Sequence, residues 1–221
     1  MFLTIANVLS TEDVQRVQAK ASSLPWHDGA RTAGARARNV KRNLQADLTT
    51  EPGEALHDFL LSAISRHPVL KAAAWPRRFS RLLLSRSEEG GGYGQHVDNA
   101  LIGEGATRMR TDLSFTLFLS DPDLYQGGEL AIEGQGGEFA AKPAAGDLIL
   151  YPSGAIHEVR PVIQGQRLAC VGWIESLVRD VAARETLYDL QSVRTSLPQE
   201  APASLMLDKV ISNLLRRWAD S

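Results

Sequence analysis

Apolar side chains recur at helical spacing in two segments of the first third of the chain. The first segment follows a capping residue, Ser10 or Thr11, and stops near Pro25; the second follows Thr50 and stops at Pro68. The side chains on the apolar faces are Val14, Val17, Ala21 and Leu24 in the first segment, and Leu56, Leu60, Ile64 and His67 in the second. This spacing predicts two amphipathic helices that brace one side of a sheet, preceded by an N-terminal strand within residues 1–9.

From residue 80 to residue 175 the pattern changes to a period of two, which is typical of β-strands. It is clearest between Asp112 and Ser120, where the apolar alternate positions are Leu113, Phe115, Leu117 and Leu119. Short strand-like runs follow one another here, separated by turns rich in glycine, proline and aspartate. This succession favours a jelly roll, in which two antiparallel sheets face each other.

After Trp173 the helical period returns in two stripes, separated by a break between Pro198 and Pro202. The stripes consist of Ala183, Leu187 and Leu190, then Leu207, Ile211, Leu214 and Trp218. The expected fold is therefore α+β: a double-stranded β-helix (jelly-roll) core with N-terminal bracing helices and a C-terminal helical appendage. We divide the chain into a support region, 1–79, the core, 80–175, and the appendage, 176–221, whose helices are candidates for a homodimer contact.

Composition excludes several classes of protein but does not identify the class to which this chain belongs. A chain of 221 residues, of which 43% are apolar and 23% charged, suits one globular core. The net charge of −2 gives no general attraction to nucleic acid or to an anionic membrane, and no run approaches the roughly 18 apolar residues of a membrane span. Cys170 is the single cysteine and excludes an internal disulfide, which fits a cytoplasmic location.

The most informative short motif is His96-Val97-Asp98, which follows a strand-like run and a glycine-rich turn. Residues i and i+2 of a strand point to the same side, so His96 and Asp98 can reach one metal ion. His157 follows between two predicted strands and supplies a second imidazole. Two histidines and one carboxylate form the ligand set of non-haem Fe(II) oxygenases, which leaves positions open on the metal. The alternative for His96 and Asp98 is a hydrogen-bonded surface pair.

Arg167 follows His157 by ten residues, after a turn, a short strand and another turn. A hairpin of this length returns Arg167 near the metal without making it a ligand. The planar guanidinium can donate two parallel hydrogen bonds to a carboxylate and stays charged at working pH. We therefore expect Arg167 to hold the far carboxylate of a dicarboxylate cosubstrate, although it could also be a surface arginine on a strand.

These motifs carry a resemblance to a known family. Together with residues 110–122 and 125–130 and the flanks 33–45 and 172–180, they make the chain resemble Fe(II)/2-oxoglutarate dioxygenases of the prolyl/lysyl hydroxylase type. It is especially similar to the small bacterial PKHD-type hydroxylases associated with iron uptake. The resemblance implies Fe²⁺ held by His96, Asp98 and His157, and 2-oxoglutarate held by Arg167.

The same resemblance implies a reaction. Dioxygen and 2-oxoglutarate would hydroxylate an unidentified small-molecule or peptide substrate, with release of succinate and carbon dioxide, and ascorbate would keep the iron ferrous. Apart from the resemblance, Tyr93 is a candidate either for the core or for a hydroxyl that binds the cosubstrate, and Asn99 and Asp112 are candidates to orient the ligands. Related hydroxylases commonly carry a tyrosine six residues before Tyr93, where this chain has Ser87, so another residue replaces that hydroxyl or the cosubstrate binds more weakly.

Other readings remain open at the level of sequence. A basic stretch could be a solvated loop, a lid that recognises an acidic or metal-chelating substrate, or a nucleic-acid contact; it consists of Arg31, Arg36, Arg38, Lys41 and Arg42. The last option would make the protein a nucleic-acid oxidative demethylase. A catalytically slow iron- or 2-oxoglutarate-responsive sensor is the alternative from another class, and a cupin-like isomerase or lectin-like barrel is a third. His27, His57 and His67 lack partners at ligand spacing and receive no role.

Overall fold

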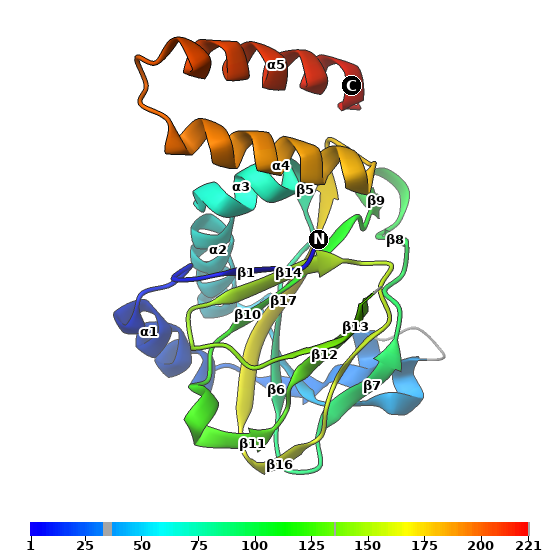
Figure 1. Cartoon of the computed structure of the whole chain (residues 1–221). Helices are drawn as coiled ribbons and strands as arrows, with labels where there is room; N and C mark the ends of the chain where they lie inside the picture. The colour runs from blue at the N-terminus through cyan, green and yellow to red at the C-terminus, as the bar shows by residue number, and fades with distance from the viewer. Residues whose placement is uncertain (33–36, 135, 221) are drawn as a thin grey trace.

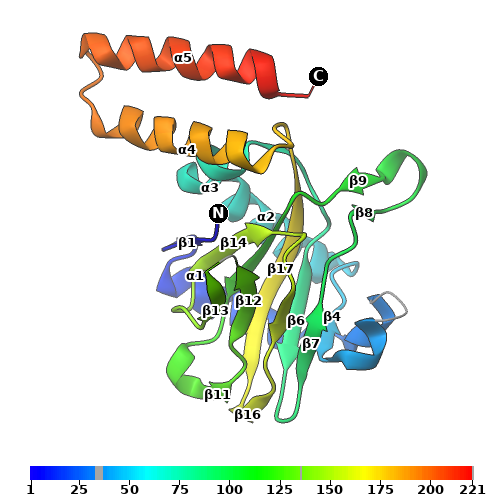
Figure 2. The same cartoon turned by 45° about the vertical axis from the view of Figure 1, so that its right-hand side comes forward.

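Two antiparallel β-sheets face each other in the computed structural model, which describes residues 1–32, 37–134 and 136–220 (Figures 1 and 2). The larger sheet has the order β1 (Leu3–Ile5), β14 (Leu148–Pro152), β10 (Leu113–Phe118), β17 (Arg167–Ser176), β6 (Leu83–Ser87), β4 (Leu44–Ala46) and β2 (Trp26–Asp28), with β5 (Pro76–Phe79) also paired to β17. The smaller sheet has the order β13 (Gly137–Ala141), β12 (Leu130–Gly134), β15 (His157–Val159), β7 (Gly92–His96) and β3 (Lys41–Arg42). This arrangement is the expected double-stranded β-helix.

Two short ribbons complete the β structure. β11 (Tyr125–Gly127) pairs with β16 (Val162–Gly165) at the end of the sandwich remote from the C-terminal helices, and β8 (Leu101–Ile102) pairs with β9 (Met109–Arg110) (Figure 1). Single turns of 3-10 helix lie at Gly29–Thr32, Ala37–Val40, Gly105–Thr107 and Pro122–Leu124. Each ribbon is a two-stranded sheet of its own, separate from the two large sheets.

Helices α1 (Thr11–Ser22), α2 (Glu51–Arg66) and α3 (Pro68–Ala74) cover the outer face of the larger sheet. Ser10 caps α1 by accepting from the Asp13 backbone N–H, and Thr50 caps α2 in the same way through Gly53. The predicted bracing helices are therefore confirmed. The sequence pattern did not indicate α3, a short helix that begins at Pro68, where we expected only an end.

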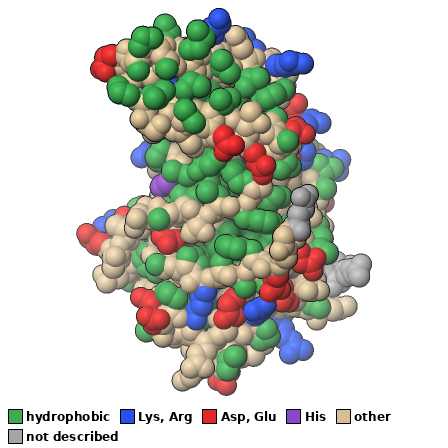
Figure 3. Space-filling view, viewed as in Figure 1, with side chains coloured by type: hydrophobic (Ala, Val, Ile, Leu, Met, Phe, Trp, Pro, Cys, Tyr) green, Lys and Arg blue, Asp and Glu red, His purple; other side chains and the backbone are tan. Residues whose placement is uncertain are grey.

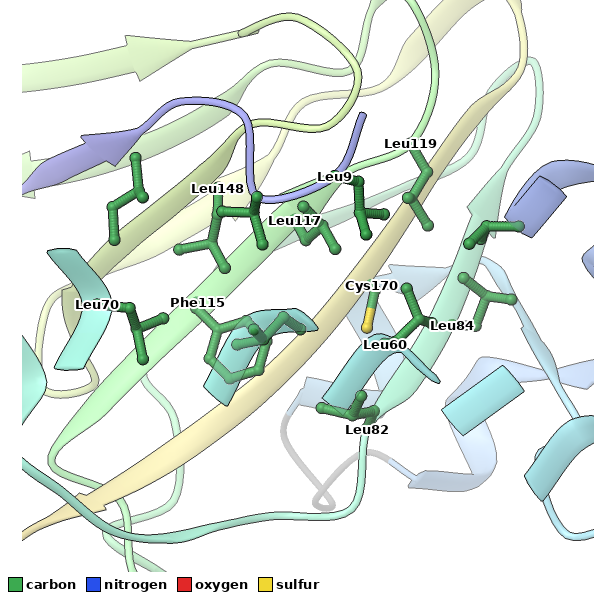
Figure 4. Packing of buried hydrophobic residues seen from close by; sticks show 14 of the residues in the cluster. Leu9, Leu60, Leu70, Leu82, Leu84, Phe115, Leu117, Leu119, Leu148 and Cys170 are labelled. Atoms are coloured by element: carbon green, nitrogen blue, oxygen red, sulfur yellow. The ribbon is translucent and has the colours of Figure 1, made fainter. Parts of the chain in front are cut away.

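The main hydrophobic core lies between these helices and the larger sheet (Figure 4). Leu60 of α2 packs with Leu84 of β6 and with Phe115 and Leu117 of β10, and none of these side chains is more than 1% exposed. Cys170 of β17 is buried in the same cluster, where burial raises the pKa of its thiol to about 12. Truncating a leucine in such a cluster costs about 2–5 kcal/mol, so this core stabilises the wall on which the site is built.

Strand β10 shows how the period of two sorts side chains between two environments. All of its residues are buried, because helices cover one face and the smaller sheet faces the other. Phe115 and Leu117 point into the helix-side core, whereas Ser114 and Thr116 line a cavity between the sheets. In this fully buried strand the polar side chains at alternate positions therefore face the space between the two sheets and do not face solvent.

Helices α4 (Val181–Ser196) and α5 (Pro202–Trp218) form an antiparallel pair above α3, at one end of the molecule (Figures 1 and 2). A separate small cluster of Val178, Ala183, Leu187 and Ile211 holds them together. Hydrophobic side chains also gather on the outside of this pair (Figure 3), and Leu205 is 76% exposed. The appendage is confirmed as helical; none of the helices that the structure describes is both long and apolar enough to span a bilayer.

The N-terminal segment contributes strands to both sheets. β1 pairs with β14, β4 pairs with β6, and β3 pairs with β7 of the smaller sheet. Residues 41–46 therefore pass from one sheet to the other and close one side of the sandwich. The division at residues 79 and 175 stays a prediction, and the strands before residue 79 belong to the same sheets as the core.

Candidate active site

Three potential metal ligands converge where β7 and β15 run side by side. His96 and His157 are direct cross-strand neighbours, and Asp98 follows β7 by two residues. The Nε2 atoms of His96 and His157 lie 3.8 Å and 3.7 Å from the two carboxylate oxygens of Asp98. One ligand atom from each residue lies within 4.8 Å of the others, so a single ion can contact all three.

Backbone carbonyls fix the orientation of both imidazole rings. Nδ1–H of His96 donates to the Gly94 carbonyl at 2.9 Å, and Nδ1–H of His157 donates to the Ala155 carbonyl at 3.0 Å. A carbonyl oxygen only accepts, so each ring carries its proton on Nδ1 and presents the Nε2 lone pair toward Asp98. Burial, and then the neighbouring His157, lower the pKa of His96 to about 4, which keeps its imidazole in the neutral form that binds metals.

A serine pair orients the carboxylate. The Ser114 hydroxyl donates to Oδ2 of Asp98 at 2.6 Å and has the Ser153 hydroxyl 2.7 Å away. A hydroxyl has one proton to donate, so Ser153 donates to Ser114 while Ser114 donates to Asp98. We expected Asn99 and Asp112 in this role. The structure differs: Asp112 accepts from Arg110 and from the Ser176 backbone N–H, and the Asn99 backbone carbonyl accepts from Thr111.

Arg167 begins β17 and is 2% exposed, although it carries a guanidinium. Its Nε and Nη2 atoms are buried and have no hydrogen-bond partner among the residues that the structure describes, while the guanidinium carbon lies 5.1 Å from the centre of the Phe118 ring. Burial lowers the pKa of Arg167. Unsatisfied buried donors are costly in a native fold, and a carboxylate is one acceptor whose two oxygens match a guanidinium.

Ser87 is buried on β6 and is the direct cross-strand neighbour of Arg167 on β17. The hydroxyls of Tyr125 on β11 and Tyr151 on β14 lie close enough to Arg167 to raise its pKa, against the effect of burial. The Tyr125 hydroxyl is buried beside the Arg167 guanidinium, and Tyr151 lines the cavity with its ring 5.0 Å from that of His157.

One cavity joins the metal-ligand residues to Arg167. Its wall includes His96, Asp98, His157 and Arg167 together with residues from both sheets. The other polar side chains in the wall are Lys41, Asn43, Gln45, Ser85, Ser87, Tyr93, Ser114, Thr116, Tyr151 and Trp173. The Tyr93 ring stacks on His96 with 3.6 Å between ring centres, and burial next to Asp98 raises the pKa of Tyr93 to about 12. All five residues that the sequence singled out for the site therefore line the same cavity.

The described residues of the basic stretch within 31–42 do not share one exposed surface. Arg31, Arg38 and Arg42 are exposed, whereas Lys41 is buried in the cavity wall; Arg36 lies outside the described residues. Sequence reasoning missed Lys41, Ser114 and Tyr151 as site residues. The signal for Ser114 was present, because a serine at an alternate position of an apolar strand faces the opposite side from the core. The histidines that received no role, His27, His57 and His67, lie outside the cavity wall.

Comparison with solved structures supports the fold. A prolyl hydroxylase from Trichoplax adhaerens, in complex with a hypoxia inducible factor peptide fragment, matches with a TM-score of 0.56 and 18% identity over 86% of each chain. A prolyl-4-hydroxylase from Pseudomonas putida matches with a TM-score of 0.52 and 22% identity, over 79% of this chain and 92% of that one. At these identities the likeness shows a shared fold and nothing finer.

Sequence relatives are much closer. A family model described as the 2OG-Fe(II) oxygenase superfamily matches residues 82–175. A PKHD-type hydroxylase from Hyphomonas neptunium is 46% identical over 99% of both chains, and one from Synechococcus elongatus is 46% identical over the full length of both. With this identity across the whole length, and not only across the matched core, the chain belongs to the PKHD-type hydroxylases of the 2OG-Fe(II) oxygenase superfamily.

Proposed function

We propose that this Fe(II)- and 2-oxoglutarate-dependent dioxygenase hydroxylates a small-molecule or peptide substrate, with His96, Asp98 and His157 as iron ligands and Arg167 as the cosubstrate anchor. One observation carries the assignment: the three ligand atoms face one cavity, and the same cavity contains a buried guanidinium with unsatisfied donors. The ligand set suits Fe(II), and the orphaned donors of Arg167 suit the distal carboxylate of 2-oxoglutarate.

Iron with 2-oxoglutarate and dioxygen supplies the oxidant for hydroxylation, and succinate and carbon dioxide leave as products. The chain's own contribution is to bind, orient and exclude water. The Gly94 and Ala155 carbonyls hold Nε2 of both histidines toward the metal position, and Ser114 holds the carboxylate of Asp98. His157 is 5% exposed and Arg167 is 2% exposed, so bulk water has little access to either group.

We also propose the finer features that the family resemblance suggests. Ascorbate would keep the iron ferrous, and the physiological role would be linked to iron uptake or homeostasis. The single buried thiol of Cys170 supports a cytoplasmic location. The exposed apolar side chains of Leu205, Met206 and Val210 on α5 support a homodimer contact through the C-terminal helices.

Succinate release tests the proposed function directly. Wild-type protein is incubated with Fe(II), 2-oxoglutarate and air, and compared with Asp98→Ala, Arg167→Met and the exposed control Arg42→Met. We expect Asp98→Ala to lose iron binding and turnover, and Arg167→Met to raise the KM for 2-oxoglutarate by about tenfold or more, as the loss of a charge-assisted hydrogen bond implies. Normal turnover by Asp98→Ala contradicts the assignment, and wild-type binding of both ligands without succinate favours the sensor.

A further inference from the structure

A second cleft lies on the opposite face of the strands that carry Arg167 and Ser87. Its volume is about 350 Å³, within the usual size range of sites for small molecules. Among the described residues it shares no lining residue with the active-site cavity. The wall of this second cleft consists of Gln18, Ala21, Ser22, Trp26, Arg86, Ser120, Leu124, Gln166 and Leu168.

The period of two along β6 and β17 separates the two sites. Arg86 and Leu168 are cross-strand partners that line the second cleft, whereas the next pair, Ser87 and Arg167, lines the active-site cavity. Successive side chains of a strand point to opposite faces of the sheet. The second cleft is therefore on the side of the larger sheet that α1 covers, and a ligand there does not enter the active-site cavity.

Arg86 supplies the cation of the second cleft. Its guanidinium carbon lies 4.4 Å from the centre of the Trp26 ring, a cation–π contact that limits the movement of the group. Its Nε atom forms an ion pair of 3.2 Å with Glu88, whose side chain is 55% exposed and lies outside the cleft wall. No described residue accepts a hydrogen bond from Nη1 or Nη2 of Arg86. These two atoms can bind a carboxylate end-on while Glu88 keeps its contact with Nε.

Several other polar groups of the wall are used within the protein. The Ser22 hydroxyl and the Trp26 indole N–H donate to backbone carbonyls of α1. The Ser120 hydroxyl donates to the carbonyl of residue 166 and accepts from the backbone N–H of residue 168. These groups shape the wall, and their donors are already occupied.

Two side-chain amides leave their oxygens to a ligand. Nε2 of Gln18 donates to the Leu119 carbonyl at 2.6 Å, and Nε2 of Gln166 donates to Glu88 at 3.4 Å. Because each NH₂ group faces an acceptor, the Oε1 atom of each amide is the part that can still accept a hydrogen bond. A guanidinium edge and two acceptor oxygens in one cleft match an anion that also carries a donor group.

From these observations we infer that the second cleft binds a small hydroxy acid, whose carboxylate pairs with Nη1 and Nη2 of Arg86 and whose hydroxyl donates to Gln18 or Gln166. The site is separate from the iron ligands and from Arg167, so the inference does not rest on the proposed function. It also leaves the ion pair between Arg86 and Glu88 in place.

Three matched probes test this site: L-malate, succinate and succinamide. Zn(II) replaces Fe(II) so that the protein stays diamagnetic, and the NMR signal of the Trp26 indole N–H reports binding from within the wall. We expect succinate to bind about tenfold more tightly than succinamide, in line with a charge-assisted hydrogen bond. L-Malate should bind about threefold more tightly than succinate, because its added hydroxyl has an acceptor in the wall.

Variants assign these preferences to residues. We expect Arg86→Met to abolish the preference for the acid, and Arg86→Lys to weaken it, because an ammonium cannot form two parallel hydrogen bonds. The double variant Gln18→Met with Gln166→Met should remove the difference between L-malate and succinate. Arg167→Met and the exposed change Arg42→Met should leave both preferences intact. Circular dichroism establishes that each variant is folded, and Arg86→Gln is a second charge-free variant if Arg86→Met does not fold.

Four results overturn the inference. The first is no preference for succinate over succinamide at the Trp26 signal of the wild-type protein, and the second is a preference that persists in folded Arg86→Met or Arg86→Gln. The third is loss of the preference in Arg167→Met, because the acid would then act from the active-site cavity. The fourth is equal affinity for L-malate and succinate, which would exclude a hydroxy acid as the ligand class.

Discussion

At the scale of single residues, the site depends on side chains that orient the proposed ligands as well as on the ligands themselves. The three ligand residues each have a specific hydrogen-bond partner: a backbone carbonyl for each histidine and the Ser114 hydroxyl for Asp98. Such partners fix tautomer and direction, and their removal commonly reduces metal affinity by about 10–100-fold. The serine pair is therefore the residue-level feature most open to mutation, because the backbone carbonyls cannot be substituted.

Ser114→Ala should weaken Fe(II) binding by about tenfold, because the Asp98 carboxylate loses its hydroxyl donor and the Ser153 hydroxyl loses its acceptor. Anaerobic competition with a chromophoric chelator measures the affinity. Ser192→Ala is the control, since this serine is exposed on α4. An unchanged Fe(II) affinity in Ser114→Ala would show that the serine pair does not orient the ligand.

Gly128 lies against Tyr125 and Arg167, the residue that we propose as the cosubstrate anchor. Its φ of +68° lies in the left-handed region, and an added Cβ would lie 3.0 Å from the Tyr125 ring and 3.1 Å from Cδ of Arg167. Gly128→Ala should therefore lower stability by about 1–2 kcal/mol and raise the KM for 2-oxoglutarate. Gly136→Ala, with no atom within 4 Å of its added Cβ, should change neither. Equal KM values for the two variants would contradict this account.

At the scale of elements, local sequence signals explain the helices well and the strands only in part. Helix starts depend on one capping side chain and its neighbours, so the sequence alone predicted a cap at Ser10 or Thr11 and another at Thr50, and the structure identifies Ser10 and Thr50 as the caps. The strands of residues 26–46 are two or three residues long and take their pairing from distant segments. No local period of two can develop over so short a length, so these strands could not be predicted.

The N-cap of α4 offers a quantitative test at this scale. The Asp180 carboxylate accepts a hydrogen bond of 2.7 Å from the Ala183 backbone N–H. Asp180→Ala should lower the free energy of unfolding by about 1 kcal/mol, measured as a shift of the urea midpoint. Asp189→Ala, an exposed change within the same helix, is the matched control. Similar midpoints for both variants would mean that the cap contributes nothing to global stability.

At the scale of the whole molecule, the protein contains a main core that supports the site and a smaller cluster that holds the C-terminal pair. The main core lies between α1–α3 and the larger sheet, whereas Ile211 of α5 belongs to the cluster formed with Leu187 of α4. Local contacts of this kind allow one part of a molecule to open without unfolding the rest. The site cavity has no lining residue from α4 or α5.

Ile211→Ala should therefore loosen the C-terminal pair selectively. Ile211 is 6% exposed, and its truncation costs about 2 kcal/mol or more in the small cluster. Hydrogen exchange should accelerate in α4 and α5 while succinate release is unchanged. Val193→Ala on α4, at a position 51% exposed, is the control and should alter neither. Loss of succinate release in Ile211→Ala would show that the C-terminal pair and the site form one cooperative unit.

The sequence by itself determined the order of the long elements, and it predicted the ligand set and the cosubstrate anchor that we propose. These features follow from short motifs, from capping residues and from hydrophobic periods, all of which act between residues close in the chain. Only the tertiary structure decided that Ser114 holds Asp98, that Tyr125 and Tyr151 are placed around Arg167 beside Ser87, and that Lys41 is buried while the described arginines of the basic stretch are exposed. Burial and partner choice are set by segments that pair across tens of residues, and no local pattern records which segments will meet.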